Sequence, residues 1–231
     1  MKQFSTAFIP FLCIALTACG TAGDGNNGGV TGGQGDFNQY EENLETAADI
    51  AAGIRSTSRL DVAPTQDTAS MSGVFAIDTT SITPLGIPGE LVGEMTMNAD
   101  FGNSTVSGQL HNTFLDYGST QDPLTGSMQY NGDIEVVAGE TVSSGIDGVA
   151  PQYTDVDAHG EATFTAPDGT TYNVFADLFG DVHEVPDLDP TTPDPILAVN
   201  GLIEGNVTIT DPDDATNPLI YDMYGNYIVH E

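Results

Sequence analysis

The feature that most constrains the fold is an alternation of apolar and polar side chains that starts near Ala69 and continues to the end of the sequence. From Leu91 to Phe101, apolar residues or Gly occupy every second position and mostly polar residues lie between them. A period of two puts one set of side chains on each face of a strand, so the pattern predicts a strand with one buried face. Further apolar faces lie at 71–77, 106–114, 128–136, 162–178, 197–209 and 220–229.

Turn signals separate several of these strands. Gly102-Asn103, Asn131-Gly132 and Asp168-Gly169 are each flanked by alternating residues and predict hairpins. The sequence therefore predicts about eight antiparallel strands in hairpin order, which is typical of an up-and-down barrel or a sandwich. We favour the closed barrel because closure removes exposed strand edges.

Glycines within the apolar faces support a strongly bent sheet. Gly inside a strand permits sharp bending or close approach of another strand, as a small barrel requires. The same pattern places Phe114 on the apolar side with Val106 and Leu110. The predicted fold class is mainly β, an antiparallel up-and-down β-barrel of about eight strands. The glycines are Gly73, Gly93, Gly108, Gly201 and Gly205.

Residues 36–60 predict one amphipathic α-helix before the barrel domain of residues 61–231. Asp36 is a suitable N-cap, and Gln39 three positions later completes a capping-box pattern. We expect the apolar stripe of this helix to pack against the barrel, and a coiled coil with a partner helix is the alternative. The stripe consists of Phe37, Tyr40, Leu44, Ala47, Ala51 and Ile54.

The start of the chain has the layout of a secretory signal peptide. Lys2 precedes an apolar run over residues 7–16 that is too short to span a bilayer. The four residues at its end resemble the lipobox of bacterial lipoproteins: Leu16, Thr17, Ala18 and Cys19. That resemblance implies a signal peptide of residues 1–18, cleavage before Cys19, and acyl chains such as palmitate on Cys19. An ordinary secreted protein is the alternative.

Residues 19–35 are rich in Gly and Asn and predict a flexible tether between the anchor and the domain. Gly20 follows the lipobox, where Asp commonly retains such lipoproteins in the inner membrane. The resemblance therefore implies a lipid anchor in the outer membrane, with exposure at the cell surface as one arrangement. The membrane is thus one expected partner, reached through the acyl chains on Cys19.

The charge balance of the sequence limits which other partners the protein can bind. The sequence has 34 acidic residues against 3 Lys and Arg, a formal net charge of −31. Such a chain repels phosphate backbones, so we expect no nucleic acid partner. The carboxylates are scattered, mostly in expected turns, which favours a role in solubility over attraction of a basic partner or a divalent cation.

Catalytic and metal-binding patterns are weak. Cys13 lies in the predicted leader and Cys19 would be acylated, which leaves no thiol for chemistry. The densest group of candidate metal ligands surrounds His183, and two shorter acidic runs resemble incomplete calcium loops. We therefore expect no catalytic residues, no metal site and no cofactor, and predict that the protein is not an enzyme. The groups are Asp181, His183, Glu184, Asp187 and Asp189; Asp155, Asp157 and His159; and Asp211, Asp213 and Asp214.

Two segments, Ala69–Gly73 and Met97–Gly108, carry a family resemblance. The second contains an Asp-Phe-Gly turn followed by a Val-Ser-Gly strand start, and together they resemble the β-barrel domain of the transferrin-binding protein B family and its small bacterial lipoprotein relatives. The resemblance implies an eight-stranded barrel on a surface lipoprotein that binds a protein or small ligand. This chain has one barrel and one helix where the full receptors have two lobes, and no ligand-binding residue can be carried over.

The function predicted from the sequence is a lipid-anchored barrel that acts as a binding module for an unknown protein or small ligand. The alternative is a structural envelope lipoprotein that associates through its N-terminal helix. A membrane-spanning β-barrel is a third hypothesis, because alternating strands can also cross an outer membrane.

Overall fold

A computed structural model describes residues 36–57, 60, 64, 66–78, 90–118, 120–137, 153–188 and 194–231. Contacts divide the chain into two units, Met1–Thr31 and Gly32–Glu231, and all described residues belong to the second. The predicted signal peptide, lipobox and tether lie outside the described residues, as do residues 138–152.

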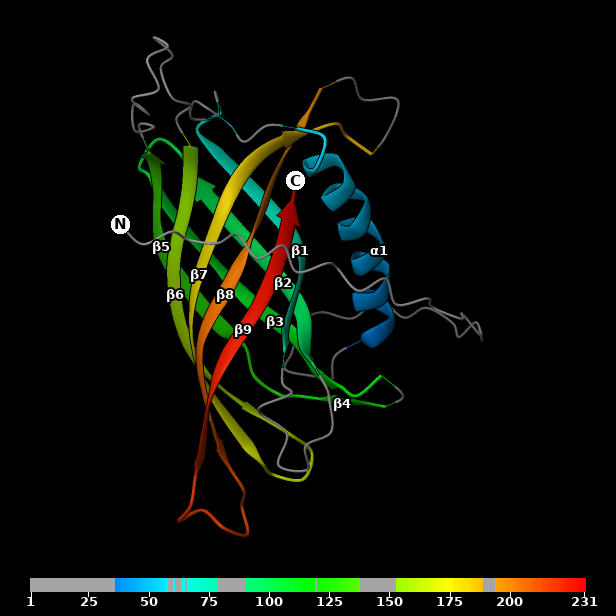
Figure 1. The fold of residues 1–231 in the computed structure, drawn as a ribbon, viewed down its shortest axis with the longest axis vertical. Helices are drawn as coiled ribbons and strands as arrows, with labels where there is room; N and C mark the ends of the chain where they lie inside the picture. Colours follow the sequence, from blue (N-terminus) through cyan, green and yellow to red (C-terminus); the bar gives the residue numbers. More distant parts are fainter. Residues whose placement is uncertain are drawn as a thin grey trace, which may run out of the picture. The chain divides into compact units, whose positions relative to one another are not determined.

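The described chain forms one helix and nine strands, all paired antiparallel (Figure 1). Strand β1 pairs with both β2 and β9, and β2 also pairs with β3, so eight strands close into a barrel in chain order. The short β4 pairs only with the end of β3. The predicted fold is confirmed. The elements are α1 (Phe37–Ile54), β1 (Thr68–Asp78), β2 (Glu90–Asp100), β3 (Thr105–Asp116), β4 (Gln121–Pro123), β5 (Met128–Val137), β6 (Tyr153–Thr165), β7 (Thr171–Val185), β8 (Ile196–Thr210) and β9 (Leu219–His230).

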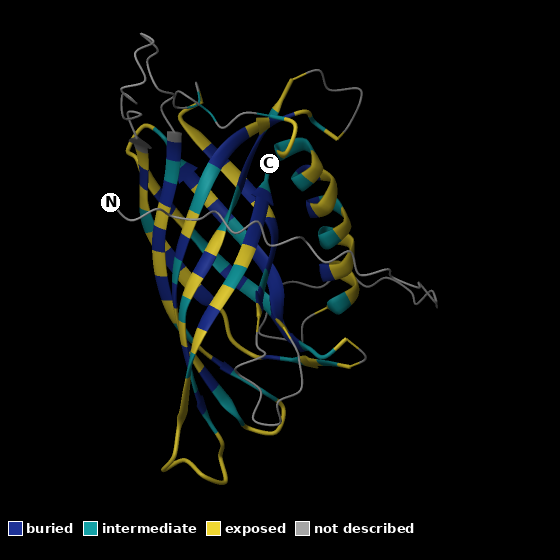
Figure 2. Cartoon of the chain, in the orientation of Figure 1, coloured by how far each residue is buried: buried dark blue, intermediate teal, exposed yellow. Residues whose placement is uncertain are grey.

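Side chains fill the interior of the barrel. Burial alternates along the strands, as Figure 2 shows by its blue and yellow bands. Inward-facing aromatic rings from five strands pack in the interior together with methionine and aliphatic side chains. Three of the predicted inward glycines make room for these rings, because a Cβ at Gly93, Gly108 or Gly201 would overlap an interior aromatic ring. The largest interior side chains include Phe75, Met95, Met97, Tyr130, Phe164, Leu178, Ile203 and Tyr227.

Helix α1 covers part of the outer surface of the barrel (Figure 1). Its N-cap is Asp36, as predicted, and the carboxylate accepts a hydrogen bond from the backbone N–H of Asn38 at 3.1 Å. Tyr40, Ala47 and Ile50 are buried against outward-facing side chains of the barrel. The prediction that the stripe packs on the barrel is therefore confirmed. The barrel residues beneath the helix are Val74, Val92, Phe114, Val185, Ala198 and Ile228.

The prediction that Phe114 lies on the apolar inner face with Val106 and Leu110 is wrong. Phe114 points outward and its ring meets that of Phe37 edge-on at a centroid distance of 5.2 Å. The cause is an irregularity in the pairing of β2 with β3 between Val92 and Glu94. Asn112 on β3 has a φ of 47° there, and the extra residue switches the parity of the strand.

The predicted turn at Asn131-Gly132 is also wrong, because both residues lie within β5. Asn131 pairs with Ser107 on β3 and with His159 on β6. Gly132 faces inward, where a Cβ would overlap the carbonyl oxygen of Asp157. The glycine therefore permits close approach of β6 to β5 rather than a turn.

Another predicted turn is confirmed, and two strands are longer than expected. The turn at Asp168-Gly169 separates β6 from β7 as predicted, and Gly169 has a φ of 92°. Strand β7 continues to Val185, beyond the predicted apolar face that ends at residue 178. Strand β9 is continuous from Leu219 to His230, so the apolar residues at 220–221 and 227–229 belong to one strand.

Candidate functional site

A shallow groove crosses the outer face of β5 to β9. Its volume is about 440 Å³. Strand alternation turns carboxylates and two large apolar side chains toward it, while the backbone of inward-facing residues forms its floor. The lining residues are Glu135, Asp155, Val156, Asp157, Phe179, Gly180, Asp181, Asn200, Gly201, Leu202 and Asn226.

The strand register sets the carboxylates of the groove in a row. Asp155 on β6 lies directly opposite Glu135 on β5 and directly opposite Asp181 on β7. Like charges at directly opposite positions of adjacent strands repel each other. The carboxylates were expected mostly in turns, and the structure corrects this, since these three lie on the outer face of one sheet.

An apolar row begins on β7, two residues from Asp181, and continues onto β8 and β9. Phe179 on β7 is directly opposite Leu202 on β8, and they are 41% and 50% exposed. Tyr224 on β9 is 61% exposed and diagonal to Leu202, which pairs with Asn226. Large apolar side chains grouped on the surface mark sites of interaction more often than single ones do.

The groove offers hydrogen-bond acceptors and few donors. No Lys or Arg is among its described lining residues. The Oδ1 atom of Asn200 is buried there without a hydrogen-bond partner. An unsatisfied buried acceptor is costly, so a donor that reached this oxygen would be favoured. Ammonium and guanidinium groups are donors only, and they match a surface of this kind.

Behind the groove, two paired positions of adjacent strands are glycines and contribute no side chains to the barrel interior. Gly180 on β7 pairs with Gly201 on β8, and the ring of Tyr227 lies against both from the inside. The hydroxyl of Tyr227 is buried without a partner, and burial raises its pKa, with a further contribution from Asp181. By contrast, the hydroxyl of the interior Tyr130 donates to the carbonyl oxygen of Thr96 at 2.7 Å.

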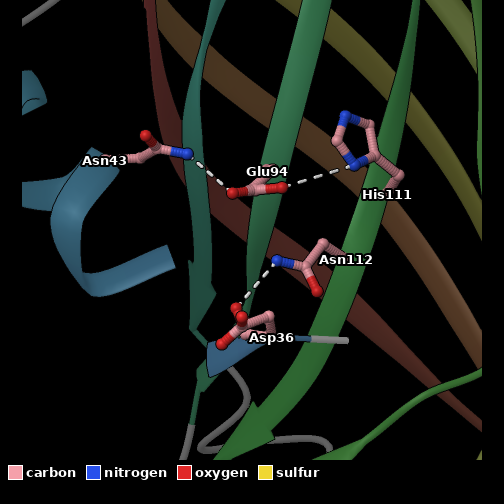
Figure 3. A network of polar contacts seen from close by, with 5 residues as sticks. All are labelled: Asp36, Asn43, Glu94, His111 and Asn112. Carbon is pink, nitrogen blue, oxygen red and sulfur yellow. Dashed lines mark hydrogen bonds and ion pairs between the residues drawn. The ribbon is translucent and has the colours of Figure 1, made fainter. Parts of the chain in front are cut away.

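A second polar cluster lies between α1 and the barrel (Figure 3). Glu94 is 5% exposed, and its Oε1 accepts a hydrogen bond from Nδ2 of Asn43 at 2.6 Å. Nδ1 of His111 lies 3.6 Å from Oε2 of Glu94. Nearby, Asn112 donates to the backbone oxygen of Asp36 at 3.0 Å. These contacts join the first half of the helix to the irregularity in β2 and β3.

Burial raises the pKa of Glu94, and the hydrogen bonds from Asn112 and Asn43 offset part of that rise. Burial also lowers the pKa of His111. Both shifts favour the neutral forms, as expected for groups covered by a helix. The cluster therefore acts as a structural contact of the helix with the barrel.

The candidate metal ligands from the sequence do not converge. Asp155, Asp157 and His159 lie at alternate positions of β6, so they belong to a strand rather than to a loop. His183 is buried on β7, and Asp189 lies outside the described residues. Asp211 accepts a hydrogen bond from the backbone of Asp213 at 2.8 Å within an exposed turn. Among the described residues, no three His, Cys, Asp or Glu side chains are placed to hold a metal ion.

Cys19 and the lipobox residues Leu16, Thr17 and Ala18 lie outside the described residues. The sequence interpretation missed Phe179, Leu202 and Asn200 as site residues. A signal was present, because Phe175 and Phe179 share the parity of Asp177 and Asp181 on an otherwise polar strand face. Within the described residues, α1 lacks the length and apolar character needed to cross a bilayer.

The chain belongs to the structural class of closed eight-stranded antiparallel barrels, here with a filled interior, one external helix and an external groove. Comparisons with protein-family models, with curated proteins and with solved structures found no match to it.

Proposed function

We propose that this protein is a lipid-anchored binding module that presents the outer face of its barrel to a ligand. The observation that carries the proposal is the contrast between interior and exterior. Apolar side chains fill the inside, whereas the outside carries a groove with exposed Phe179 and Leu202. A filled barrel binds on its surface, since a ligand pocket needs space that side chains do not occupy.

The anchor in this proposal is Cys19, with the Gly- and Asn-rich residues 19–35 as the tether. Each buried acyl CH₂ contributes about 0.8 kcal/mol to membrane binding, so two or more chains hold a domain stably. The resemblance to the transferrin-binding protein B barrel supports a receptor role at the outer membrane, with the ligand left open. The outer faces of β6 and β7 carry Asp155, Asp157 and Asp177, which suits an aqueous surface rather than lipid contact.

The alternative of assembly through the N-terminal helix has less support. The stripe that would bind a partner is already packed on Val74, Val92 and Phe114. A partner helix would have to displace that packing before it could bind.

Two measurements test the proposal. Mass spectrometry of the protein from a Gram-negative host should find acyl chains on Cys19, and Cys19→Ser should move the protein from the membrane fraction to the soluble fraction. Affinity purification with the wild-type protein should then recover a ligand from envelope or environmental samples. A bare Cys19 would overturn the anchor, and failure to recover any ligand would overturn the receptor role.

A further inference from the structure

We propose that the groove on β5 to β9 binds a protein segment in which Lys or Arg side chains alternate with apolar side chains. This inference rests on the proposed function as a binding module and adds the surface and the chemistry of the partner. Three features of the groove carry it: an apolar row, an acidic row and a buried acceptor.

The apolar row calls for an apolar contact from the partner. Phe179 and Leu202 are directly opposite each other and about half exposed, and the ring of Tyr224 extends the row. The three side chains come from adjacent strands of a rigid sheet, so a ligand finds them already in place. A small hydrophilic ion would leave the apolar side chains of this row exposed to water.

The acidic row calls for cations. Glu135 and Asp155 are directly opposite on adjacent strands and Asp157 lies two residues further along β6, so the mutual repulsion of these carboxylates falls when a cation lies among them. The buried Oδ1 of Asn200, which pairs in register with Asp181, lacks a donor. An ammonium or guanidinium group supplies both the charge and the donor.

The two rows meet on β7, where Asp181 and Phe179 are two residues apart and therefore point to the same outer face. In an extended segment, successive side chains point to opposite sides. A segment that lies along the boundary between the rows therefore directs its cations to Asp155 and its apolar side chains to Phe179. This is why we infer alternation rather than a block of like residues.

Charge also excludes the occupants that the chain itself could provide. A second copy carries the same formal charge of −31, so like-charged surfaces would meet. The three cations of the sequence are Lys2, Arg55 and Arg59, and no two of them alternate with apolar residues. The partner is therefore a different, basic protein.

The test is fluorescence anisotropy of the purified full-length protein with a labelled eight-residue peptide of alternating lysine and leucine. We expect binding that weakens with added salt, because screening reduces attraction between exposed charges. Peptides of alternating glutamate and leucine, and of alternating lysine and serine, serve as controls. The first control should not bind, and the second should bind at least about tenfold more weakly, a loss of about 1.4 kcal/mol.

Two double variants locate the site. Asp155→Asn with Asp157→Asn, and Phe179→Ser with Leu202→Ser, should each weaken binding of the lysine–leucine peptide about tenfold or more. The matched control is Glu41→Gln with Glu45→Gln on the exposed face of α1, which removes the same charge as the first pair and should change affinity less than about twofold. Circular dichroism and thermal melting verify that all three variants are folded.

Equal affinity of the groove variants and the helix variant would overturn the inference, as would equal binding of both lysine peptides or no binding of either. Failure of this inference is distinguishable from failure of the proposed function. If the wild-type protein recovers a ligand from envelope samples and the groove variants recover it equally well, the barrel is a binding module whose site lies elsewhere.

Discussion

Within the described part of the chain, outward apolar side chains lie both under α1 and on β7 and β8, and α1 covers the first group. Under α1, Val92, Phe114 and Ile228 point outward and are buried. On β7 and β8, Phe179 and Leu202 point outward as well and remain about half exposed. We refer to these as the covered face and the bare face.

The difference shows that outward apolar side chains of this barrel are shielded from water where another segment packs on them. On the covered face the chain itself supplies the packing, since α1 precedes the barrel and lies on it. The two faces also differ in charge. The covered face holds the buried carboxylate of Glu94 with a hydrogen bond from Asn43, whereas four carboxylates line the groove of the bare face.

The largest expected effect comes from placing the same charge on each face. Val92→Asp buries a carboxylate beneath α1 and should lower the free energy of unfolding by about 3 kcal/mol or more. Leu202→Asp adds a charge to an exposed position and should change it by about 0.5 kcal/mol or less. Urea denaturation of both variants measures the two values. Similar losses for both would show that the two faces do not differ in packing.

Much of the fold was predictable because periodicity alone assigns inward and outward residues. The alternation from Leu91 to Ala99, the inward Gly73 and Gly201, and the packing of the helix stripe all followed from the sequence. The parity switch at Asn112 did not, since it depends on how β3 pairs with β2. The Asn-Gly signal at 131–132 failed because tertiary pairing with two strands overrides local turn preference.

The groove was less predictable, because it is a property of register. Glu135, Asp155 and Asp181 are at least 20 residues apart in the sequence, and only strand pairing brings them into one row. Each of them alone is an ordinary outward residue of a strand. The exposure of Phe179 and Leu202 likewise depends on where α1 stops covering the barrel.

The wall behind the bare face can be tested through two interior tyrosines. Tyr130→Phe removes a hydroxyl that donates to Thr96 and should cost about 1 kcal/mol. Tyr227→Phe removes a buried hydroxyl without a partner, next to Gly180 and Gly201, and should leave stability unchanged or raise it by up to about 1 kcal/mol. Thermal or urea unfolding of both variants measures this difference. A larger loss from Tyr227→Phe would reveal that this hydroxyl is satisfied after all.

On the covered face, the contribution of Glu94 to the free energy of unfolding depends on pH. The pKa of Glu94 is raised by burial, so the folded protein binds this proton more tightly than the unfolded chain does. Its contribution to stability is therefore fully present at low pH and is lost as the pH rises through the raised pKa. Glu94→Gln keeps an oxygen for Asn43 and removes the charge. We expect it to raise the free energy of unfolding by about 0.5 to 1 kcal/mol at pH 7 and by less at pH 4.5.

The measurement is urea denaturation at several pH values for the wild type and the variant. His111 lies 3.6 Å from Oε2 of Glu94, so its contribution does not cancel: protonated His111 favours the charged carboxylate and further reduces the advantage of the variant at acid pH. An advantage of Glu94→Gln that grows toward acid pH would have the wrong sign and would contradict the assignment.

The smallest expected effect concerns the bare face without its partner. Asp155 lies between Glu135 and Asp181 in the acidic row, and Asp155→Asn removes the middle charge. The variant should be more stable than the wild type by about 0.3 to 0.5 kcal/mol at low salt, and the gain should shrink as salt screens the row. Glu41→Gln, on the exposed face of α1, removes one charge outside the row and should give a smaller gain. If Asp155→Asn were less stable than the wild type, Asp155 would stabilise the fold. Its position opposite two carboxylates would then have a structural rather than a ligand-binding explanation.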